Sequence, residues 1–360
     1  MKQIKVNLDK RSYKIIIEHG VLSRAGELVS KRVSSKRGVI ITNNTVSKLY
    51  LEKLEKSFES EELDCEVIKI PDGEQYKTLK TCETIFDRMV DARIDRTGFV
   101  VALGGGVVGD IAGYVASTYM RGIEFVQIPT TLLAHVDSSV GGKVGVNLKK
   151  GKNLVGSFYQ PTIVLIDPSV LETLPEREYA AGITEVIKYG IIWEKSFFSY
   201  LERNMDKLLS HDNTVLEKVI AVSCDIKAKV VEDDEREAGL RAILNYGHTV
   251  GHAIESATNY KKYLHGEAIS IGMCAVCYMG IELGMIDKEV CERIEKLLVR
   301  AGLPVKADGP KASSVIKRLL LDKKVRQGKV RFVLPHEIGR VIICESIPHE
   351  IVKRSVEKVL

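Results

Sequence analysis

One acidic and three imidazole side chains occur at spacings that suit a metal ion. Glu185 stands three residues before Lys188 in an apolar helical run, so the two side chains share one helix face. His248 and His252 share a face of a later helix, and His265 begins the next one. Any one of these residues also suits a salt bridge or a hydrogen-bonded core histidine. Together, Glu185, His248 and His265 favour a metal, because a carboxylate and two imidazoles with an open position make a catalytic zinc site.

A glycine-rich turn follows an apolar strand-like run and precedes a helical one. Gly104, Gly106 and Gly109 have the spacing GxGxxG, which lets the backbone approach a pyrophosphate at a helix N-terminus. The pattern predicts a dinucleotide site, although a tight turn without a ligand would share it. The acidic residue expected about 20 positions further on, for the ribose, would be Glu124, which precedes the next strand instead of ending it. The ribose contact could therefore come from elsewhere, such as Asn43.

Two loops and one basic segment add candidate binding groups. Residues 71–77 (PDGEQYK) and 129–131 (PTT) follow predicted strands, where parallel sheets bind ligands, although both also suit an ordinary turn or helix start. Residues 135–143 (HVDSSVGGK) lead to residues 151–153 (GKN), and Arg121 lies upstream. Lysines beside flexible backbone and hydroxyl groups suit phosphate recognition, and solvated loop lysines are the alternative.

The elements that would position these groups change type along the chain. In the first half, predicted strands and helices alternate, which indicates parallel βα units around a sheet buried on both faces. The strands are 39–42, 65–70, 99–103 and 125–128, after an opening strand within residues 1–9, and the helices are 46–58, 78–90 and 110–119. After about Thr173 helical periodicity dominates, over residues 179–204, 214–235, 245–257 and 267–283, with a late hairpin at 330–334 and 340–344.

These patterns predict two domains. Residues 1–175 should form an α/β domain with a parallel, Rossmann-like sheet that binds NAD, and residues 176–360 a mainly α-helical domain that binds metal and substrate. The segment around Pro175 is a plausible boundary, since a proline followed by an acid begins a helix well.

Composition narrows the function classes. The chain has 360 residues, of which 45% are hydrophobic, and its net charge of +5 is too weak to predict binding to nucleic acid. No signal peptide and no run long enough to cross a membrane is visible. Seven scattered cysteines favour reduced thiols in a cytoplasmic protein. The single CxxC pair, Cys274 and Cys277, lies in an apolar helix, so we expect buried core thiols there.

The motifs PDGEQYK, GGGVVGD, PTTLL, VDSSVGGK, GKN, TLP, EVIKYG, NYGHTVGHAIE, HGEA and DKK occur in one order over about residues 71–324. In this the chain resembles the 3-dehydroquinate synthases, a family of sugar-phosphate cyclases. The resemblance implies a nucleotide-binding α/β domain, a helical domain and an active site between them. It also implies NAD, one divalent zinc or cobalt ion, a small phosphate-bearing substrate and a homodimer. Tyr246 and Val250 stand where the family frequently has Phe, and His135 where it frequently has Gln or Met.

The resemblance also assigns residues to roles. The metal ligands would be Glu185, His248 and His265. The NAD site would comprise Asp72, Gly73, Glu74, Gln75, Tyr76, Lys77, Gly104, Gly105, Gly106, Val107, Val108, Gly109, Asp110, Thr130, Thr131, Lys143, Lys152, Val170, Leu171, Glu172 and Thr173. The substrate would meet Arg121, Asp137, Lys143, Lys152, Asn153, Lys188, Lys227, Arg241, Asn245 and His252, and one of Lys323 and Lys324.

The implied reaction converts 3-deoxy-arabino-heptulosonate 7-phosphate into 3-dehydroquinate and phosphate, by transient oxidation, β-elimination, re-reduction and an aldol closure. It accounts for the lysines, which would bind two anionic groups, and for His252, which can relay a proton. Three alternatives remain at this point: another sugar-phosphate cyclase, a metal-dependent alcohol dehydrogenase of the glycerol dehydrogenase type, and a non-catalytic NAD-binding regulator.

Overall fold

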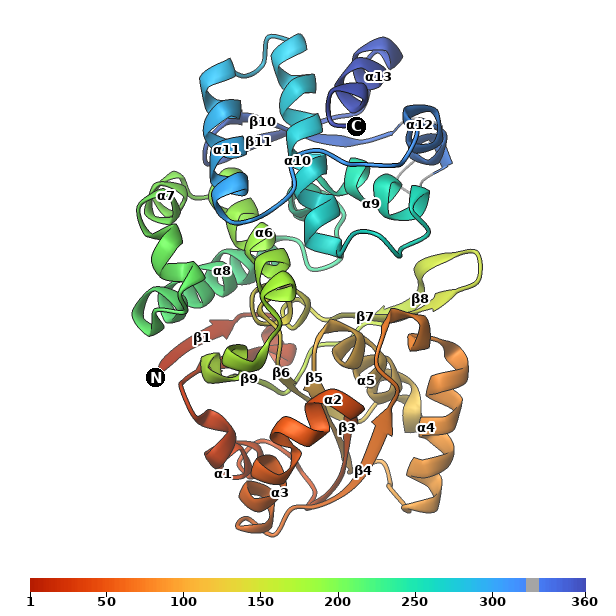
Figure 1. Cartoon of the computed structure of the whole chain (residues 1–360). Helices are drawn as coiled ribbons and strands as arrows, with labels where there is room; N and C mark the ends of the chain where they lie inside the picture. Colours follow the sequence, from red (N-terminus) through yellow and green to blue (C-terminus); the bar gives the residue numbers. More distant parts are fainter. Residues whose placement is uncertain (322–329) are drawn as a thin grey trace. The chain divides into compact units, whose positions relative to one another are not determined.

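The computed structural model describes residues 1–321 and 330–360, and the chain divides into two compact units (Figure 1). Unit 1 comprises Met1–Leu174 and Ser223–Arg236, and unit 2 comprises Pro175–Val222 and Glu237–Leu360. No helix of the described ranges is both long enough and apolar enough to cross a membrane.

Unit 1 is built on a mainly parallel sheet, which confirms the predicted fold class. Its seven strands follow the order β1-β2-β9-β6-β5-β3-β4, and the pairing is parallel except between β1 and β2. They are β1 (Lys2–Val6), β2 (Tyr13–Ile17), β3 (Arg37–Asn43), β4 (Asp64–Ile70), β5 (Phe99–Gly104), β6 (Glu124–Pro129) and β9 (Ile163–Ile166). Strands β2 and β9 were not predicted.

Helices cover both faces of this sheet (Figure 1). Strand β5 shows the arrangement, because Val100 and Ala102 join one hydrophobic core while Val101 and Leu103 join the other. The first core includes residues of α4 (Leu79–Asp91) and α5 (Gly106–Thr118), and the second includes residues of α1 (Ala25–Ser30) and α3 (Glu52–Glu59). The predicted helix 46–58 is divided, since a short α2 (Asn44–Val46) and a π-helical segment (Ser47–Leu51) precede α3.

From Lys143 onward the basic, glycine-rich segment folds as a hairpin, which corrects the expectation of flexible backbone there, whereas Ala134–Ser138 form a π-helical segment. Strands β7 (Lys143–Leu148) and β8 (Gly151–Phe158) pair antiparallel, with Gly145 opposite Gly156. A Cβ atom on Gly156 would stand 2.2 Å from the Val144 carbonyl oxygen. The glycines therefore serve close backbone approach, while Val144 and Val146 point into the core.

Unit 2 is mainly helical. The predicted helix 179–204 is two helices, α6 (Glu176–Ile192) and α7 (Lys195–Leu209), because Glu194 accepts a hydrogen bond from the Ser196 amide and begins α7. Helices α9 (His248–Ala257) and α10 (His265–Glu282) match predicted helices. Helices α11 (Lys288–Arg300), α12 (Ala312–Leu321) and α13 (His349–Lys358) were not predicted, and the predicted late hairpin is confirmed as β10 (Phe332–Glu337) and β11 (Arg340–Cys344).

The second part of α8 (Asn213–Asp233) groups with unit 1, so the division is not a single cut near residue 175. The Cys224 thiol donates to the His135 carbonyl oxygen at 3.2 Å, and Glu235 accepts hydrogen bonds from Arg11 and Gln160. These contacts join residues far apart in the sequence, which is why local patterns did not indicate them.

Candidate functional site

Glu185, His248 and His265 converge on one point in unit 2. The Nε2 atom of His248 is 3.5 Å from the Glu185 Oε1 atom, and the Nε2 atom of His265 is 4.0 Å from the same oxygen. One possible ligand atom from each residue falls within 4.8 Å of the others. Glu185 is fully buried in α6, while His248 and His265 are the first residues of α9 and α10.

Glycines at the helix crossings allow this convergence. A Cβ atom on Gly266 would stand 1.9 Å from the Ala181 carbonyl oxygen, so only glycine lets the start of α10 approach α6 so closely. On Gly272, a Cβ atom would stand 2.0 Å from the Gly247 carbonyl oxygen at the start of α9. The spacing between the three candidate ligands is therefore set by backbone contacts between their helices.

The donor atoms fit a divalent ion. His248 Nδ1 lies 3.0 Å from the Tyr246 carbonyl oxygen, and His265 Nδ1 lies 3.4 Å from Glu255 Oε2. Both histidines then carry their proton on Nδ1 and present the Nε2 lone pair toward Glu185, as metal-ligating histidines do. Within the described ranges the Oε1 atom of Glu185 accepts no hydrogen bond, so it is available to a metal.

Lys188 lies beside this centre. Its ammonium group is in ion-pair contact with Glu185 Oε2 and only 1% of its side chain is exposed. The prediction that the two residues share a helix face is confirmed. Because the ammonium engages one carboxylate oxygen, a metal would meet the other one.

The glycine turn and the neighbouring loop of unit 1 also come together. The Thr130 amide donates to the Gly104 carbonyl oxygen at 3.0 Å, and a Cβ atom on Gly105 would stand 2.9 Å from the Thr131 methyl carbon. Helix α5 begins at Gly106, four residues before the predicted start, so its first amides lie within the glycine turn itself. This strand–turn–helix geometry is that of a pyrophosphate site.

Lys77 connects three of the segments singled out in the sequence. It is 4% exposed, forms an ion pair with Asp110 of α5 and donates to Asn153 Oδ1 at 2.7 Å. Lys152 Nζ lies 3.8 Å from a carboxylate oxygen of Glu74. The 71–77 loop, Asp110 of α5 and the β7–β8 hairpin therefore form one polar cluster in unit 1.

Comparisons with known proteins agree with this geometry. A sequence profile described as 3-dehydroquinate synthase N-terminal matches residues 67–181, and one described as 3-dehydroquinate synthase C-terminal matches residues 182–325. A 3-dehydroquinate synthase from Thermodesulfovibrio yellowstonii is 50% identical over 355 residues, which cover 98% of this chain and 99% of that protein. The chain belongs to the 3-dehydroquinate synthase family.

Solved structures of other cyclases share the whole fold. The 2-epi-5-epi-valiolone synthase of Streptomyces hygroscopicus subsp. jinggangensis, solved with NAD+ and Zn2+, is 26% identical and has a TM-score of 0.90, covering 98% of each chain. A 2-deoxy-scyllo-inosose synthase, solved with carbaglucose-6-phosphate, NAD+ and Co2+, is also 26% identical, with a TM-score of 0.89 and coverage of 100% of each chain.

The other residues implicated by resemblance to the family are distributed over both units. In unit 1, Lys227 donates to Asp137 Oδ1 at 2.7 Å, and the hydroxyl groups of Tyr50 and Thr173 are hydrogen-bonded to each other. Arg121 is exposed in a left-handed conformation, with φ of 70°. Val170 and Leu171 are buried, and Lys143 is exposed at the start of β7.

In unit 2, Arg241 is buried, and Asn245 donates to Glu237 at 2.7 Å. His252 is part-exposed on α9, with its Nε2 atom 4.0 Å from Glu255 Oε2. Lys323 and Lys324 lie outside the described residues.

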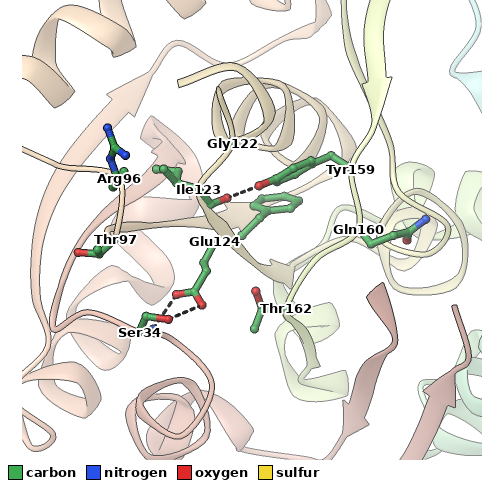
Figure 2. Close-up of a pocket in the computed structure, with 10 residues that line it drawn as sticks. Ser34, Arg96, Thr97, Gly122, Ile123, Glu124, Tyr159, Gln160 and Thr162 are labelled. Carbon is green, nitrogen blue, oxygen red and sulfur yellow. Dashed lines mark hydrogen bonds between the residues drawn. The ribbon is translucent and has the colours of Figure 1, made fainter. Parts of the chain in front are cut away.

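The adenosine-ribose candidates lie on different elements. Glu124 begins β6 at the amino end of the sheet, where it accepts hydrogen bonds from the Ser34 amide at 2.7 Å and hydroxyl at 2.9 Å (Figure 2). It lines an open hollow of about 450 Å³ there, together with Tyr159 and Arg96. The glycine turn follows the carboxyl end of β5, whereas Glu124 is at the amino end of the neighbouring parallel strand β6. The two therefore lie at opposite ends of the strands. The Oδ1 atom of Asn43 accepts a hydrogen bond from the Val46 amide, so this side chain caps the start of α2.

The CxxC pair is confirmed as buried core thiols. Tyr246 Oη lies 3.3 Å from Cys277 Sγ, so the tyrosine that replaces the frequent Phe has a hydrogen-bonding partner inside the core. Sequence reasoning missed Glu255. Its signal was the helical spacing, because Glu255 follows His252 by three residues and His248 by seven, which places all three on one face.

Proposed function

We propose that this chain is a 3-dehydroquinate synthase, which converts 3-deoxy-arabino-heptulosonate 7-phosphate into 3-dehydroquinate and phosphate. The observation that carries this conclusion is the identity of 50% to a 3-dehydroquinate synthase over nearly the full length of both chains. The convergence of Glu185, His248 and His265 supplies the geometry that such an enzyme needs for a metal.

Glu185 Oε1, His248 Nε2 and His265 Nε2 would hold the divalent ion. When bound, the ion supplies Lewis acidity toward a substrate hydroxyl group. Lys188 keeps the second oxygen of Glu185 engaged, so the carboxylate would offer the metal a single oxygen. Three protein ligands leave a coordination position open for the substrate.

The glycine turn and the adjacent polar cluster would bind NAD, as the structures of the two related cyclases suggest. When bound, NAD accepts a hydride from the C5 carbon of the substrate and later returns it. The amides at the start of α5 would face the pyrophosphate of a bound NAD, and the Thr130 and Thr131 loop borders the turn. Lys77 fixes this region through Asp110 and Asn153.

The cationic side chains would bind the carboxylate and the phosphate of the substrate. We assign this role to the set that the family resemblance implies, namely Arg121, Lys143, Lys152, Lys188, Lys227 and Arg241, with one of Lys323 and Lys324. Asp137, Asn153 and Asn245 would contact hydroxyl groups. His252 is part-exposed and can move a proton at its ring nitrogen.

The residue set suits the order of events. A ketone at C5 would acidify the neighbouring C6 proton. An oxygen of the phosphate group could take that proton as phosphate leaves by β-elimination, and reduction at C5 would follow. Ring opening and an intramolecular aldol step close the carbocycle. The hydride is borrowed and not consumed, so one bound NAD should support many turnovers.

The decisive experiment measures phosphate release from the heptulosonate phosphate, with catalytic NAD and with substrate that carries deuterium at C5. We expect stoichiometric phosphate, product that retains the deuterium, and no net NADH. Phosphate release from only a different sugar phosphate would assign the chain to another cyclase activity. NADH that accumulates in step with product would make it a dehydrogenase.

We further propose that the protein is a homodimer located in the cytoplasm, as the family resemblance implies. Light scattering during size-exclusion chromatography should give twice the chain mass of 40.0 kDa. A monomer at the concentrations used in the assay would contradict the dimer without affecting the proposed chemistry.

A further inference from the structure

We propose that Glu255 is a positioning residue that sets the metal affinity of the site by orienting His265, and that orients His252 as well. This inference rests on the proposed metal role of Glu185, His248 and His265, but not on the identity of the substrate. Glu255 is 4% exposed and comes from the same helix face as His248 and His252.

One carboxylate oxygen faces both imidazoles. Glu255 Oε2 lies 3.4 Å from His265 Nδ1 and 4.0 Å from His252 Nε2. The first distance is within hydrogen-bond reach and the second is not. The two rings are themselves adjacent, with centroids 5.6 Å apart. Glu255 therefore lies within hydrogen-bond distance of His265 and within ion-pair distance of His252.

The bond to His265 has a direct chemical consequence. An acceptor at Nδ1 holds the ring proton there, so the lone pair of Nε2 is the one that faces Glu185. A carboxylate acceptor also raises the basicity of the ligand nitrogen more than a neutral acceptor would. In the corresponding place, the Nδ1 atom of His248 lies beside a backbone carbonyl, that of Tyr246. His265 is also the more exposed ligand, at 33% of its side chain against 11% for His248. It therefore has more need of a side chain that restrains it.

The test compares the full-length wild type with Glu255→Gln, Glu255→Ala and a matched control, Glu202→Gln. Glu202 is a part-buried carboxylate of unit 2 that accepts hydrogen bonds from Arg293, away from the metal ligands. Each protein is stripped of metal, its melting temperature is recorded, and its Zn2+ affinity is measured by competition with a fluorescent chelator. The absorption spectrum of the Co2+ form reports the geometry at the ion.

Loss of an outer partner of a metal ligand typically weakens binding by about 10–100-fold. We expect Zn2+ affinity to fall about 10-fold in Glu255→Gln, which keeps a neutral acceptor, and about 100-fold in Glu255→Ala, with a shifted Co2+ spectrum. Glu202→Gln should bind both ions as the wild type does. Because glutamine has the shape of glutamate, Glu255→Gln should keep the metal-free melting temperature close to that of the wild type.

The same substitutions in a His252→Ala background separate the effect of Glu255 on His265 from its effect on His252. If Glu255 acts on affinity through His265, the loss of Zn2+ affinity persists without His252. At saturating Zn2+, Glu255→Ala should lower kcat in the wild-type background but not in the His252→Ala background. Wild-type affinity and spectrum in Glu255→Ala, or an affinity loss that disappears without His252, would overturn the inference. A wild-type protein that binds neither ion would instead refute the proposed metal site.

Discussion

Replacing His135 by glutamine should make the protein less sensitive to acid. His135 is fully buried in unit 1, and its Nε2 atom lies 2.9 Å from the carbonyl oxygen of Pro129, at the end of β6. Within the described ranges its Nδ1 atom has no hydrogen-bond partner. Burial lowers the pKa of His135 to about 4, although the bond to Pro129 opposes this shift. The folded protein therefore holds a neutral imidazole that donates to Pro129 through Nε2.

The direction in which stability changes with pH follows from the number of protons bound by the folded and the unfolded chain. An unfolded histidine titrates near pH ~6.5, so between about pH 6.5 and 4 the unfolded chain binds a proton that the folded chain excludes. The stability contribution is complete above this window and is lost as the pH falls through it. For a folded pKa of about 4, the loss is about 2 kcal/mol at pH ~5 and approaches about 3 kcal/mol below pH ~4.

Urea denaturation of the wild type and His135→Gln at about pH 7.5 and about pH 5 measures how much unfolding free energy His135 removes as the pH falls. Glutamine does not titrate and can still donate to Pro129, and other titrating groups cancel in the comparison. The free energy of unfolding should therefore fall by about 2 kcal/mol less in the variant between the two pH values. Equal losses in both proteins, or an NMR titration of His135 near pH ~6.5 in the folded state, would refute the reasoning.

Three further outcomes test the site. His248→Ala should lose bound metal and turnover, whereas His349→Ala, at an exposed histidine of unit 2, should keep both; metal analysis and the phosphate assay check this. Gly266→Ala should lower the free energy of unfolding by about 1–3 kcal/mol through overpacking and weaken Zn2+ binding, because its Cβ atom would meet the Ala181 carbonyl oxygen. Calorimetry and chelator competition measure these two effects. The control is Gly239→Ala, whose Cβ atom would meet nothing within 4 Å. Lys152→Ala should keep its melting temperature yet lose about 2–4 kcal/mol of transition-state stabilisation in kcat/KM, while Lys150→Ala, on the adjacent turn, should not.

Much of the fold was predictable because the central strands are buried on both faces. Such strands appear as short apolar runs, and β3, β5 and β6 were found that way. The β7–β8 hairpin was missed because glycines that indicate flexibility in isolation here serve the close contact between Gly145 and Gly156. The break between α6 and α7 was missed because helical periodicity continues across Trp193.

The proposed metal ligands were predictable for a different reason. His248 and His265 each begin a helix, and beyond the first turn of α6 the only charged residues are Glu185 and Lys188, so these residue types stand out. Glu255 did not stand out, because a single acid at helical spacing is usually on a solvated face. Only the approach of α9 to α10, which depends on the contact between Gly247 and Gly272, turns that acid toward His265. The residues that hydrogen-bond to a proposed metal ligand are brought there by tertiary contacts, which the spacing of residues in the sequence does not show.

The tertiary contact between Lys188 and Glu185 predicts that replacing Lys188 also lowers stability. From the sequence, the family resemblance assigns Lys188 only to substrate binding. In the structure its ammonium neutralises the fully buried carboxylate of Glu185. Removing one partner of a buried ion pair costs about 3–5 kcal/mol, because the remaining charge is left without compensation. Lys188→Met should therefore lower the melting temperature of the metal-free protein.

A divalent ion on Glu185 would supply the missing positive charge. Saturating Zn2+ should therefore restore most of the melting temperature of Lys188→Met, while the phosphate assay stays inactive if Lys188 also binds substrate. Calorimetry of the variant with and without Zn2+, beside the wild type, separates the two roles. If Zn2+ raises the melting temperature of the variant no more than that of the wild type, the metal and the ammonium do not share Glu185, and the site geometry proposed above is wrong.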